Sequence, residues 1–293
     1  TRQVTNMLIP TAVYIVMAVS LNLVVGLLGE LSLGHAGFMS VGLFSGCLVA
    51  IALTNTALPL MVRLPVSMLA GGLTAAVFGL LVGLPTLRLR GDYLAIVTLA
   101  CGEIIKNIIT NLHVTGGALG LNTSAIYAGA KELLPYGAAL VLLTVAVMLN
   151  LKRSKYGRAI MAIRDNRIAA ESVGLSVTRY KLAVFVIAAF FAGCAGVLYG
   201  HSLANIKAAA FDFNMSIEIL VIVVLGGMGS VPGSVVSAIV LTVLPEALRE
   251  VADYRMLVYA VVLILVMQAT NNPAMKRFFG AACKSLTPKR KER

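Results

Sequence analysis

The chain has 293 residues, of which 59% are hydrophobic and 12% are charged, and its formal net charge is +12. Soluble domains carry about 25% charged residues, so this composition excludes an ordinary soluble domain and predicts an integral membrane protein. Most Lys and Arg residues lie in Lys152–Lys181 and in the tail after Asn272. That placement is typical of membrane topology and anionic headgroups, and no nucleic-acid-binding motif accompanies it. We therefore expect contact with membrane lipid and none with nucleic acid.

Uncharged windows recur along the chain, and each holds the roughly 20 apolar residues that a helix needs to cross a bilayer. Backbone polar groups inside lipid must be satisfied within their own segment, so the spans should be helices. We predict an all-α polytopic membrane protein with about nine membrane helices or half-helices and with glycine-rich helix breaks. The expected elements are Met7–Leu28, Ala36–Leu53, Pro65–Leu84, Tyr93–Leu112, Leu134–Leu151, Leu182–Leu203, Met215–Leu225, Val235–Leu248 and Met256–Ala269.

The Lys and Arg content of each segment predicts its side of the membrane. Short translocated loops are depleted of these residues, so Lys152–Lys181 and the basic tail 272–293 should both be cytoplasmic. An even number of crossings must then separate them, which requires Met215–Leu225 and Val235–Leu248 to be separate elements. The same count places the present N-terminus outside. The sequence begins with Thr1 and not with Met, so we expect N-terminal sequence, with room for another span, to precede it.

Glycines interrupt the apolar pattern twice. The first break, Gly26–Gly37, contains further polar residues, and the second break is Gly226–Gly233. Paired interruptions of this kind point to a site within the membrane, because unwound backbone exposes N–H groups and helix N-termini attract carboxylates. The alternative is that the glycines only permit turns or close packing. The candidate residues for a substrate pathway in the two breaks are Ser32, Gly34, His35, Gly226, Gly227 and Gly229.

A polar cluster lies in the second half of the predicted span Tyr93–Leu112. Glu103, Lys106 and Asn107 are spaced i, i+3 and i+4, so they are neighbours on one helix surface. A charge at bilayer depth costs at least roughly 2.5–3.5 kcal/mol, so we expect Glu103 and Lys106 to pair and to face protein or water. Glu103 and Asn107 are therefore further pathway candidates. An ion pair that only fixes the helix is the alternative.

The basic segment is patterned as well as charged. The stretch Gly157–Gly174 is not cleanly amphipathic as a single helix, because Arg167 falls on its apolar side with Ile163. Asp165 and Asn166 offer a break and an N-cap, so two short helices are predicted. Two helices that project from the membrane would form a docking surface for a cytosolic protein. A merely solvated basic loop is the alternative.

Missing motifs exclude several kinds of chemistry. The sequence has no GxxxxGK[ST] motif and no Gly-Lys dipeptide, so the chain does not hydrolyse ATP through a P-loop. Its four cysteines are far apart and form no CxxC pair, which indicates neither a zinc site nor a disulfide framework. We expect no metal, no bound cofactor and no catalytic residues. A membrane-embedded enzyme is disfavoured for the same reason.

Several stretches, spread in order over nearly the whole chain, are distinctive when taken together. They are GELSLGHAGF (Gly29–Phe38), GDYLAIVTLACGEIIKN (Gly91–Asn107), TGGALGL (Thr115–Leu121), YGRAIMAIRDNRIAAESVG (Tyr156–Gly174) and GGMGSVPG (Gly226–Gly233). In these stretches the chain resembles the branched-chain amino acid ABC permease family, and most closely its M-type permease subunit.

The resemblance implies a permease subunit of an ATP-driven importer, multi-pass in the bacterial inner (plasma) membrane. The implied partners are a second, H-type permease subunit, two cytosolic ABC ATPase subunits that use ATP and Mg, and a periplasmic substrate-binding protein. The implied substrates are branched-chain amino acids (Leu, Ile or Val) or similar small amino acids and amides. We expect one permease domain over 1–293, an ATPase-coupling loop at 152–181 and a basic cytoplasmic tail at 272–293.

ABC permeases commonly show an E-A-A-x-x-x-G loop that docks the ATPase. Ala169, Ala170 and Gly174 match this pattern, but Ile168 stands where Glu is usual and Glu171 comes later. The expected ATPase-coupling residues are Gly157, Arg158, Arg164, Asp165, Asn166, Arg167, Ala169, Ala170, Glu171 and Gly174.

The competing hypothesis is a stand-alone secondary transporter or channel for a small polar solute. Such a protein would work without an ATPase, and Glu103 or His35 would carry proton or ion coupling. An ATP-binding partner that protects Lys152–Lys181 from proteolysis would distinguish the importer from this alternative.

Overall fold

The computed structural model is mostly helical, and it describes residues 2–54, 59–86, 89 and 91–247. Contacts within the chain separate Thr1–Thr242 from Val243–Arg293. Only the end of one helix is described in the second unit, so the architecture below is that of the first.

The long helices follow the predicted spans in order. They are α1 (Arg2–Asn22) continued by the π-helix η1 (Leu23–Leu28), α2 (His35–Thr54), α3 (Leu60–Thr86), α4 (Asp92–Asn111), α5 (Ala130–Arg153), α8 (Val177–His201), α9 (Phe213–Gly226) and α10 (Val231–Ala247). The described residues contain seven helical segments long and apolar enough to cross a membrane, and a shorter apolar helix at Val231–Pro245. The all-α, multi-pass fold is therefore confirmed, and α9 and α10 are separate helices as predicted. The expected span Met256–Ala269 and the tail 272–293 lie outside the described residues.

Several helix boundaries differ from the prediction, and two of these differences bear on the rest of the structure. α3 begins at Leu60 and runs through Pro65 and Pro85, because membrane helices tolerate Pro where neighbouring groups satisfy the freed carbonyls. α5 and α8 extend into the basic segment, so the segment between these two helices is 154–176 and not 152–181. Lys and Arg are good helix formers with long apolar stems, so basic residues do not end a helix at the membrane edge.

Glycine contacts bring α2, α3 and α8 close together. A Cβ on Gly42 of α2 would overlap the backbone of Gly193 on α8, and a Cβ on Gly71 of α3 would overlap the carbonyl group of Gly42. Small residues at such contacts let membrane helices approach closely. α1 lies against α5, α8 and α9 and is also largely buried. These helices form the frame that holds the functional segments.

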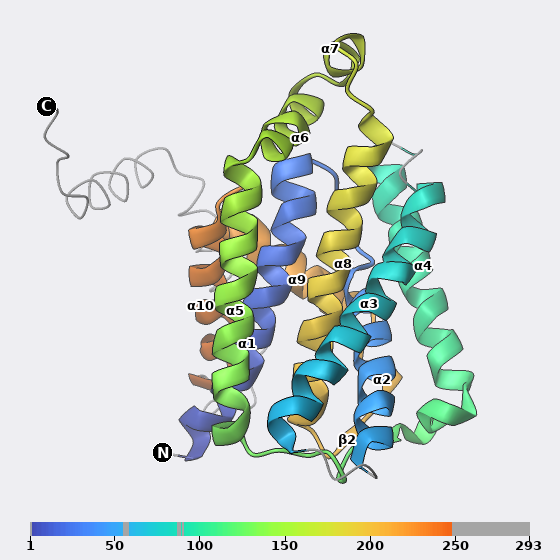
Figure 1. Ribbon diagram of the computed structural model, residues 1–293, viewed down its shortest axis with the longest axis vertical. Coiled ribbons are helices and arrows are strands. Elements are labelled where there is room, and N and C mark those ends of the chain that lie inside the picture. Colours follow the sequence, from blue (N-terminus) through green and yellow to red (C-terminus); the bar gives the residue numbers. More distant parts are fainter. Residues whose placement is uncertain (1, 55–58, 87–88, 90, 248–293) are drawn as a thin grey trace, which may run out of the picture. The chain divides into compact units, whose positions relative to one another are not determined.

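The two ends of this unit carry different structures (Figure 1). At one end, α6 (Lys155–Asp165) and α7 (Arg167–Ser172) lie beyond the ends of the long helices. At the other end, the strands β1 (Leu121–Asn122) and β2 (Asn205–Ile206) pair antiparallel. The short 3-10 helices η2 (His113–Thr115), η3 (Gly117–Leu119) and η4 (Ala208–Ala210) flank these strands in the chain.

Candidate functional site

Two short helices form in the basic segment because each has its own N-cap. The hydroxyl of Ser154 accepts a hydrogen bond from the Gly157 N–H at 3.1 Å at the start of α6. The amide oxygen of Asn166 accepts one from the Ala169 N–H at 3.1 Å at the start of α7. The predicted break and N-cap at Asn166 are confirmed. We call residues 154–176 the hairpin.

Gly174 closes α7 with the backbone geometry that glycine permits. Its φ is +86°, a left-handed conformation that costs L residues energy. The Gly174 N–H bonds to the Glu171 carbonyl, and the Leu175 N–H bonds to the Ala170 carbonyl. This pair of bonds is a Schellman motif, so the glycine of the E-A-A-x-x-x-G pattern ends the second helix of the hairpin.

The hairpin is packed and is not a loose solvated loop. Ile163, Ala170 and Val177 form a buried cluster that joins both short helices to α8. On the outside, Ile168 and Val173 are 80% and 76% exposed. Exposed apolar residues beside charged ones, on a segment beyond the spans, are typical of an interaction surface.

The charged residues of the hairpin are paired mainly with one another. Arg164 contacts Asp165 at 2.9 Å, and Arg167 contacts Glu171 at 2.8 Å. Arg158 is exposed, and its guanidinium donates to the carbonyl oxygen of Arg153, the last residue of α5. All ten predicted coupling residues lie in the hairpin.

The first break joins the hairpin through Arg164. η1 ends at Gly29, which has a φ of +77°, and the chain then runs without helix to His35. The Arg164 guanidinium donates to the Gly26 carbonyl oxygen at 3.1 Å. Carbonyl groups in the last turn of a helix lack helical partners, and a cation there is favourable. Arg164 thus caps η1 from outside.

The second break lies against the first. Gly227 and Gly229 have φ values of +85° and +82° and form the turn between α9 and α10. The Gly229 N–H donates to Oδ1 of Asn22 at 2.7 Å, and Lys152 donates to the Gly229 carbonyl oxygen at 2.6 Å. Gly226 packs on Gly233 of α10 so closely that neither can carry a Cβ.

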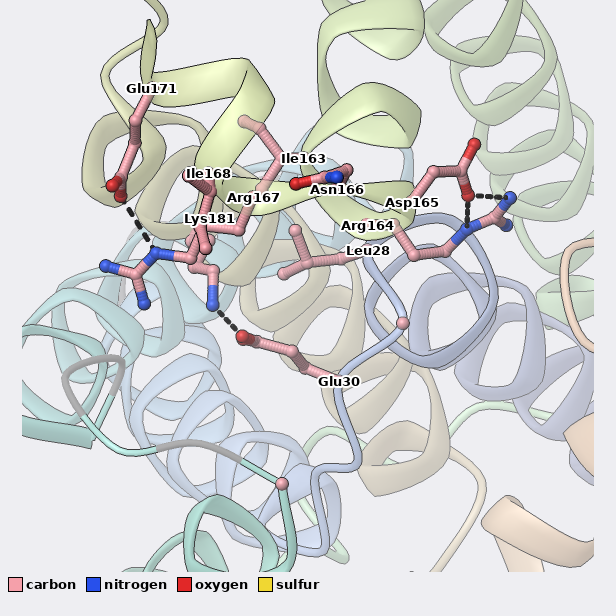
Figure 2. Close-up of a pocket in the computed structure, with 12 residues that line it drawn as sticks. Leu28, Glu30, Ile163, Arg164, Asp165, Asn166, Arg167, Ile168, Glu171 and Lys181 are labelled. Carbon is pink, nitrogen blue, oxygen red and sulfur yellow. Dashed lines mark hydrogen bonds and ion pairs between the residues drawn. The ribbon is translucent and has the colours of Figure 1, made fainter.

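A cleft of about 490 Å³ lies between the hairpin, the first break and the start of α4 (Figure 2). Lys181 of α8 and Glu30 of the first break form an ion pair at its wall, and their side chains are only 7% and 12% exposed. Oε2 of Glu30 has no hydrogen-bond partner among the described residues. The cleft combines paired charges with the apolar side chains of Leu28, Ile163 and Ile168.

The remaining pathway candidates of the first break are buried. His35 Nε2 lies 2.8 Å from the Ser20 hydroxyl, and Ser32 is 1% exposed with a hydroxyl that bonds to none of the described groups. Gly34 packs against α4, where a Cβ would approach the Thr98 carbonyl oxygen to 2.5 Å. The glycine here permits the close approach of the chain to a neighbouring helix.

Glu103 and Asn107 lie elsewhere, on α4. Glu103 and Lys106 form the predicted ion pair. Glu103 also accepts a hydrogen bond from the backbone N–H of Phe213 at 3.1 Å, so it fixes the start of α9. Asn107 is exposed, and its carbonyl group accepts a hydrogen bond from Asn111. The structure therefore does not bring the pathway candidates into one cluster.

Sequence reasoning missed several residues that connect these segments. Asn22 and Glu218 stand alone in apolar runs, and Glu218 accepts a hydrogen bond from Tyr14 at 3.2 Å. A lone polar residue in a span was the available signal, because such residues need partners. Glu30 and Lys181 were visible as charges, but their pairing across 151 positions was not. The described residues contain no group of three or more His, Cys, Asp or Glu able to hold a metal.

Comparison with known proteins gives a consistent result. The chain matches the family described as "Branched-chain amino acid transport system / permease component" over residues 3–267. It is 37% identical to the high-affinity branched-chain amino acid transport system permease protein LivM of Salmonella typhimurium, and 37% identical to LivM of Escherichia coli. Each match covers 88% of this chain and 66% of the relative, so the chain spans about two thirds of the length of these relatives.

A second kind of permease is also similar. LivH of Salmonella typhimurium, a permease protein of a high-affinity branched-chain amino acid transport system, is 32% identical over 42% of this chain and 40% of its own length. No solved structure matches the chain.

Proposed function

We propose a function from one premise: the chain belongs to the family of branched-chain amino acid transport system permease components. In this proposal it is the M-type permease subunit of an ATP-driven importer in the bacterial inner membrane. It translocates Leu, Ile, Val or similar small amino acids or amides. It forms one transmembrane domain over 1–293, in which 152–181 is the coupling loop and the tail 272–293 is cytoplasmic.

The hairpin is the observation that supports this function most strongly. It is a pair of capped helices with exposed apolar and charged side chains, and it bonds to the first break through Arg164. A surface of this kind is suited to receive a moving partner and to pass its displacement to the span bundle. Two cytosolic ATPase subunits would supply that displacement, and they, not this chain, would bind ATP and Mg.

The other partners follow from the relatives. LivM and LivH are both named as permease proteins of a branched-chain amino acid transport system, which supports pairing of this chain with an H-type permease. A periplasmic binding protein would deliver the substrate at the end that carries β1 and β2. Ser32, Gly34, His35, Glu103, Asn107, Gly226, Gly227 and Gly229 remain the proposed pathway residues.

Charge reversal in the hairpin tests the proposal. The chain is co-expressed with its H-type permease, ATPases and binding protein, and ATP-driven leucine uptake is measured in proteoliposomes. Arg164→Glu with Arg167→Glu should reduce ATPase co-purification and uptake about tenfold or more, the effect of losing about 1.4 kcal/mol of interaction.

The matched control is Lys131→Glu with Lys207→Glu. Both residues are exposed. Lys131 lies in the first turn of α5 and Lys207 directly follows β2, and the start of α5 and β2 lie at the end of the unit opposite to the hairpin (Figure 1). The change in net charge is the same, while ATPase co-purification should be unchanged. Full uptake by the hairpin variant would contradict the coupling role.

The secondary transporter or channel makes the opposite prediction. In that case the purified subunit alone moves solute without ATP, and substitution of Glu103 or His35 abolishes the coupled ion flux. Uptake that requires the ATPases and hydrolysable ATP rejects this alternative.

A further inference from the structure

One side chain next to the first break, Asn22, forms hydrogen bonds to the second break. This residue ends α1, directly before the π-helix η1, and it is 3% exposed. A buried amide in apolar surroundings is costly unless it is hydrogen-bonded. The hydrogen-bond partners of Asn22 therefore indicate its structural role.

Among the described residues, the hydrogen-bond partners of the Asn22 amide all belong to the second break or to the first turn of α10. Nδ2 donates to the Ser230 carbonyl oxygen at 3.1 Å and to the Ser234 hydroxyl at 2.9 Å. Oδ1 accepts from the Gly229 N–H at 2.7 Å. The Asn22 amide thus engages both a donor and an acceptor of the turn. These bonds fix the orientation of the amide and its distance from the turn.

The surroundings of the Asn22 amide are closely packed. A Cβ on Gly26 would overlap both the Gly229 backbone nitrogen and Oδ1 of Asn22, so only a hydrogen atom fits between the breaks. With the amide in place, the void beside Asn22 measures about 10 Å³, at the lower limit of the roughly 10–15 Å³ that one water needs. The turn is therefore held by direct bonds to the Asn22 side chain.

Each break also has its own link toward the hairpin. Arg164 of α6 donates to the Gly26 carbonyl group of the first break. Lys152, in the last turn of α5 and directly before the hairpin, donates to the Gly229 carbonyl group of the second break. Asn22 closes this arrangement, because it joins the end of α1, directly before η1, to the second break.

We infer that Asn22 is a positioning residue that makes the two glycine-rich breaks move as one unit when the hairpin is displaced. The inference rests on the proposed function for the source of the displacement. With Asn22 present, a shift received through Arg164 reaches the turn at Gly229 directly, and a shift received through Lys152 reaches η1.

Hydrogen–deuterium exchange on the complete importer in nanodiscs tests this inference. Peptides covering 23–29 and 226–234 are followed without nucleotide and with ATP plus vanadate. In the unmodified complex, the exchange rates of both peptides should change together when ATP and vanadate are added. In Asn22→Ala, the 226–234 peptide should exchange about tenfold faster without nucleotide, because the Gly229 N–H has lost its acceptor, and the two peptides should no longer change together.

Two further variants separate positioning from general destabilisation. Thr11→Val removes a hydroxyl on α1 whose hydrogen bond, among the part of the chain that the structure describes, stays within its own helix, to the Met7 carbonyl group. This variant should behave as the unmodified complex. Asn22→Asp retains the acceptor for Gly229 and should restore slow exchange there. Leucine moved per ATP hydrolysed should fall in Asn22→Ala and not in Thr11→Val.

The outcomes separate the inference from the function on which it rests. If Asn22→Ala leaves both peptides changing together at the original rates, Asn22 does not couple the breaks. If the unmodified complex takes up leucine with ATP but its two breaks change independently, the inference is overturned and the proposed function stands. If the unmodified complex shows no ATP-driven uptake, the proposed function itself fails.

Discussion

At the scale of single residues, Gly174 decides where α7 ends. We predict that Gly174→Ala makes the hairpin open more often, because a left-handed conformation costs an L residue roughly 1–2 kcal/mol. Such a change shifts a local equilibrium by about 5–30-fold. Limited trypsin digestion in nanodiscs, followed at Arg167 and Arg179, measures the opening.

Gly129→Ala is the control for this substitution. Gly129 caps α5 with a φ of −65°, and a Cβ added there would meet no neighbouring atom within 4 Å, so alanine fits without strain. Equal digestion of the two variants would show that the positive φ of Gly174 does not limit hairpin stability.

The Glu30–Lys181 ion pair supports a second residue-scale prediction. Both side chains are largely buried, so removal of one partner leaves an unpaired charge and should cost about 3–5 kcal/mol. The double variant Glu30→Gln/Lys181→Gln should cost much less than the two single variants together. Unfolding of detergent-solubilised protein by increasing SDS gives the four free energies of the cycle. Strictly additive costs would show that the two residues do not interact.

At the scale of elements, the contacts of α8 with α2 and α3 depend on two glycines, Gly42 and Gly193. We predict that Gly42→Ala separates α2 from α8 and that Gly193→Ala separates α8 from α3. Each should destabilise the bundle by about 1–3 kcal/mol, the usual cost of overpacking. The Cβ on Gly42 would overlap the backbone of Gly193, and the Cβ on Gly193 would overlap the Ala75 side chain and the Gly71 carbonyl oxygen of α3. The same SDS titration measures the loss.

Gly137→Ala on α5 is the matched control for this helix contact. A Cβ there would meet its nearest neighbours at 3.4–3.9 Å, which is ordinary van der Waals contact. The variant should keep the original midpoint. A similar loss in all three variants would indicate an effect of helix glycines in general and not of the contacts of α8 with α2 and α3.

At the scale of the whole molecule, the two ends of the first unit should lie on opposite sides of the membrane. Ile168 in the hairpin and Leu119 in η3 are 80% and 83% exposed. In a variant without native cysteines, Ile168→Cys should react with an impermeant maleimide only in inside-out vesicles, and Leu119→Cys only in intact spheroplasts. Reaction of Ile168→Cys from outside would reject the proposed orientation.

Much of the fold was predictable because a bilayer imposes strict rules on sequence. Apolar runs such as Met7–Leu28 must be helices when no water can satisfy the backbone, and the structure has a helical run there. The break at Asn166 was also predictable, since a cap depends on residues three positions apart. The end of α5 was not predictable, because the continuation of this helix through Lys152 depends on how α5 packs and meets the hairpin.

By itself, the sequence determined the membrane class, the order of the helices, the two glycine breaks and the capped hairpin. These features depend on composition and on neighbours within one or two helical turns. Only the tertiary structure decided that Asn22 bonds to the second break, that Arg164 caps η1, and that Glu30 pairs with Lys181. Those contacts join residues 138 to 207 positions apart. Their partners are selected by the packing of whole helices, which no local pattern in the chain records.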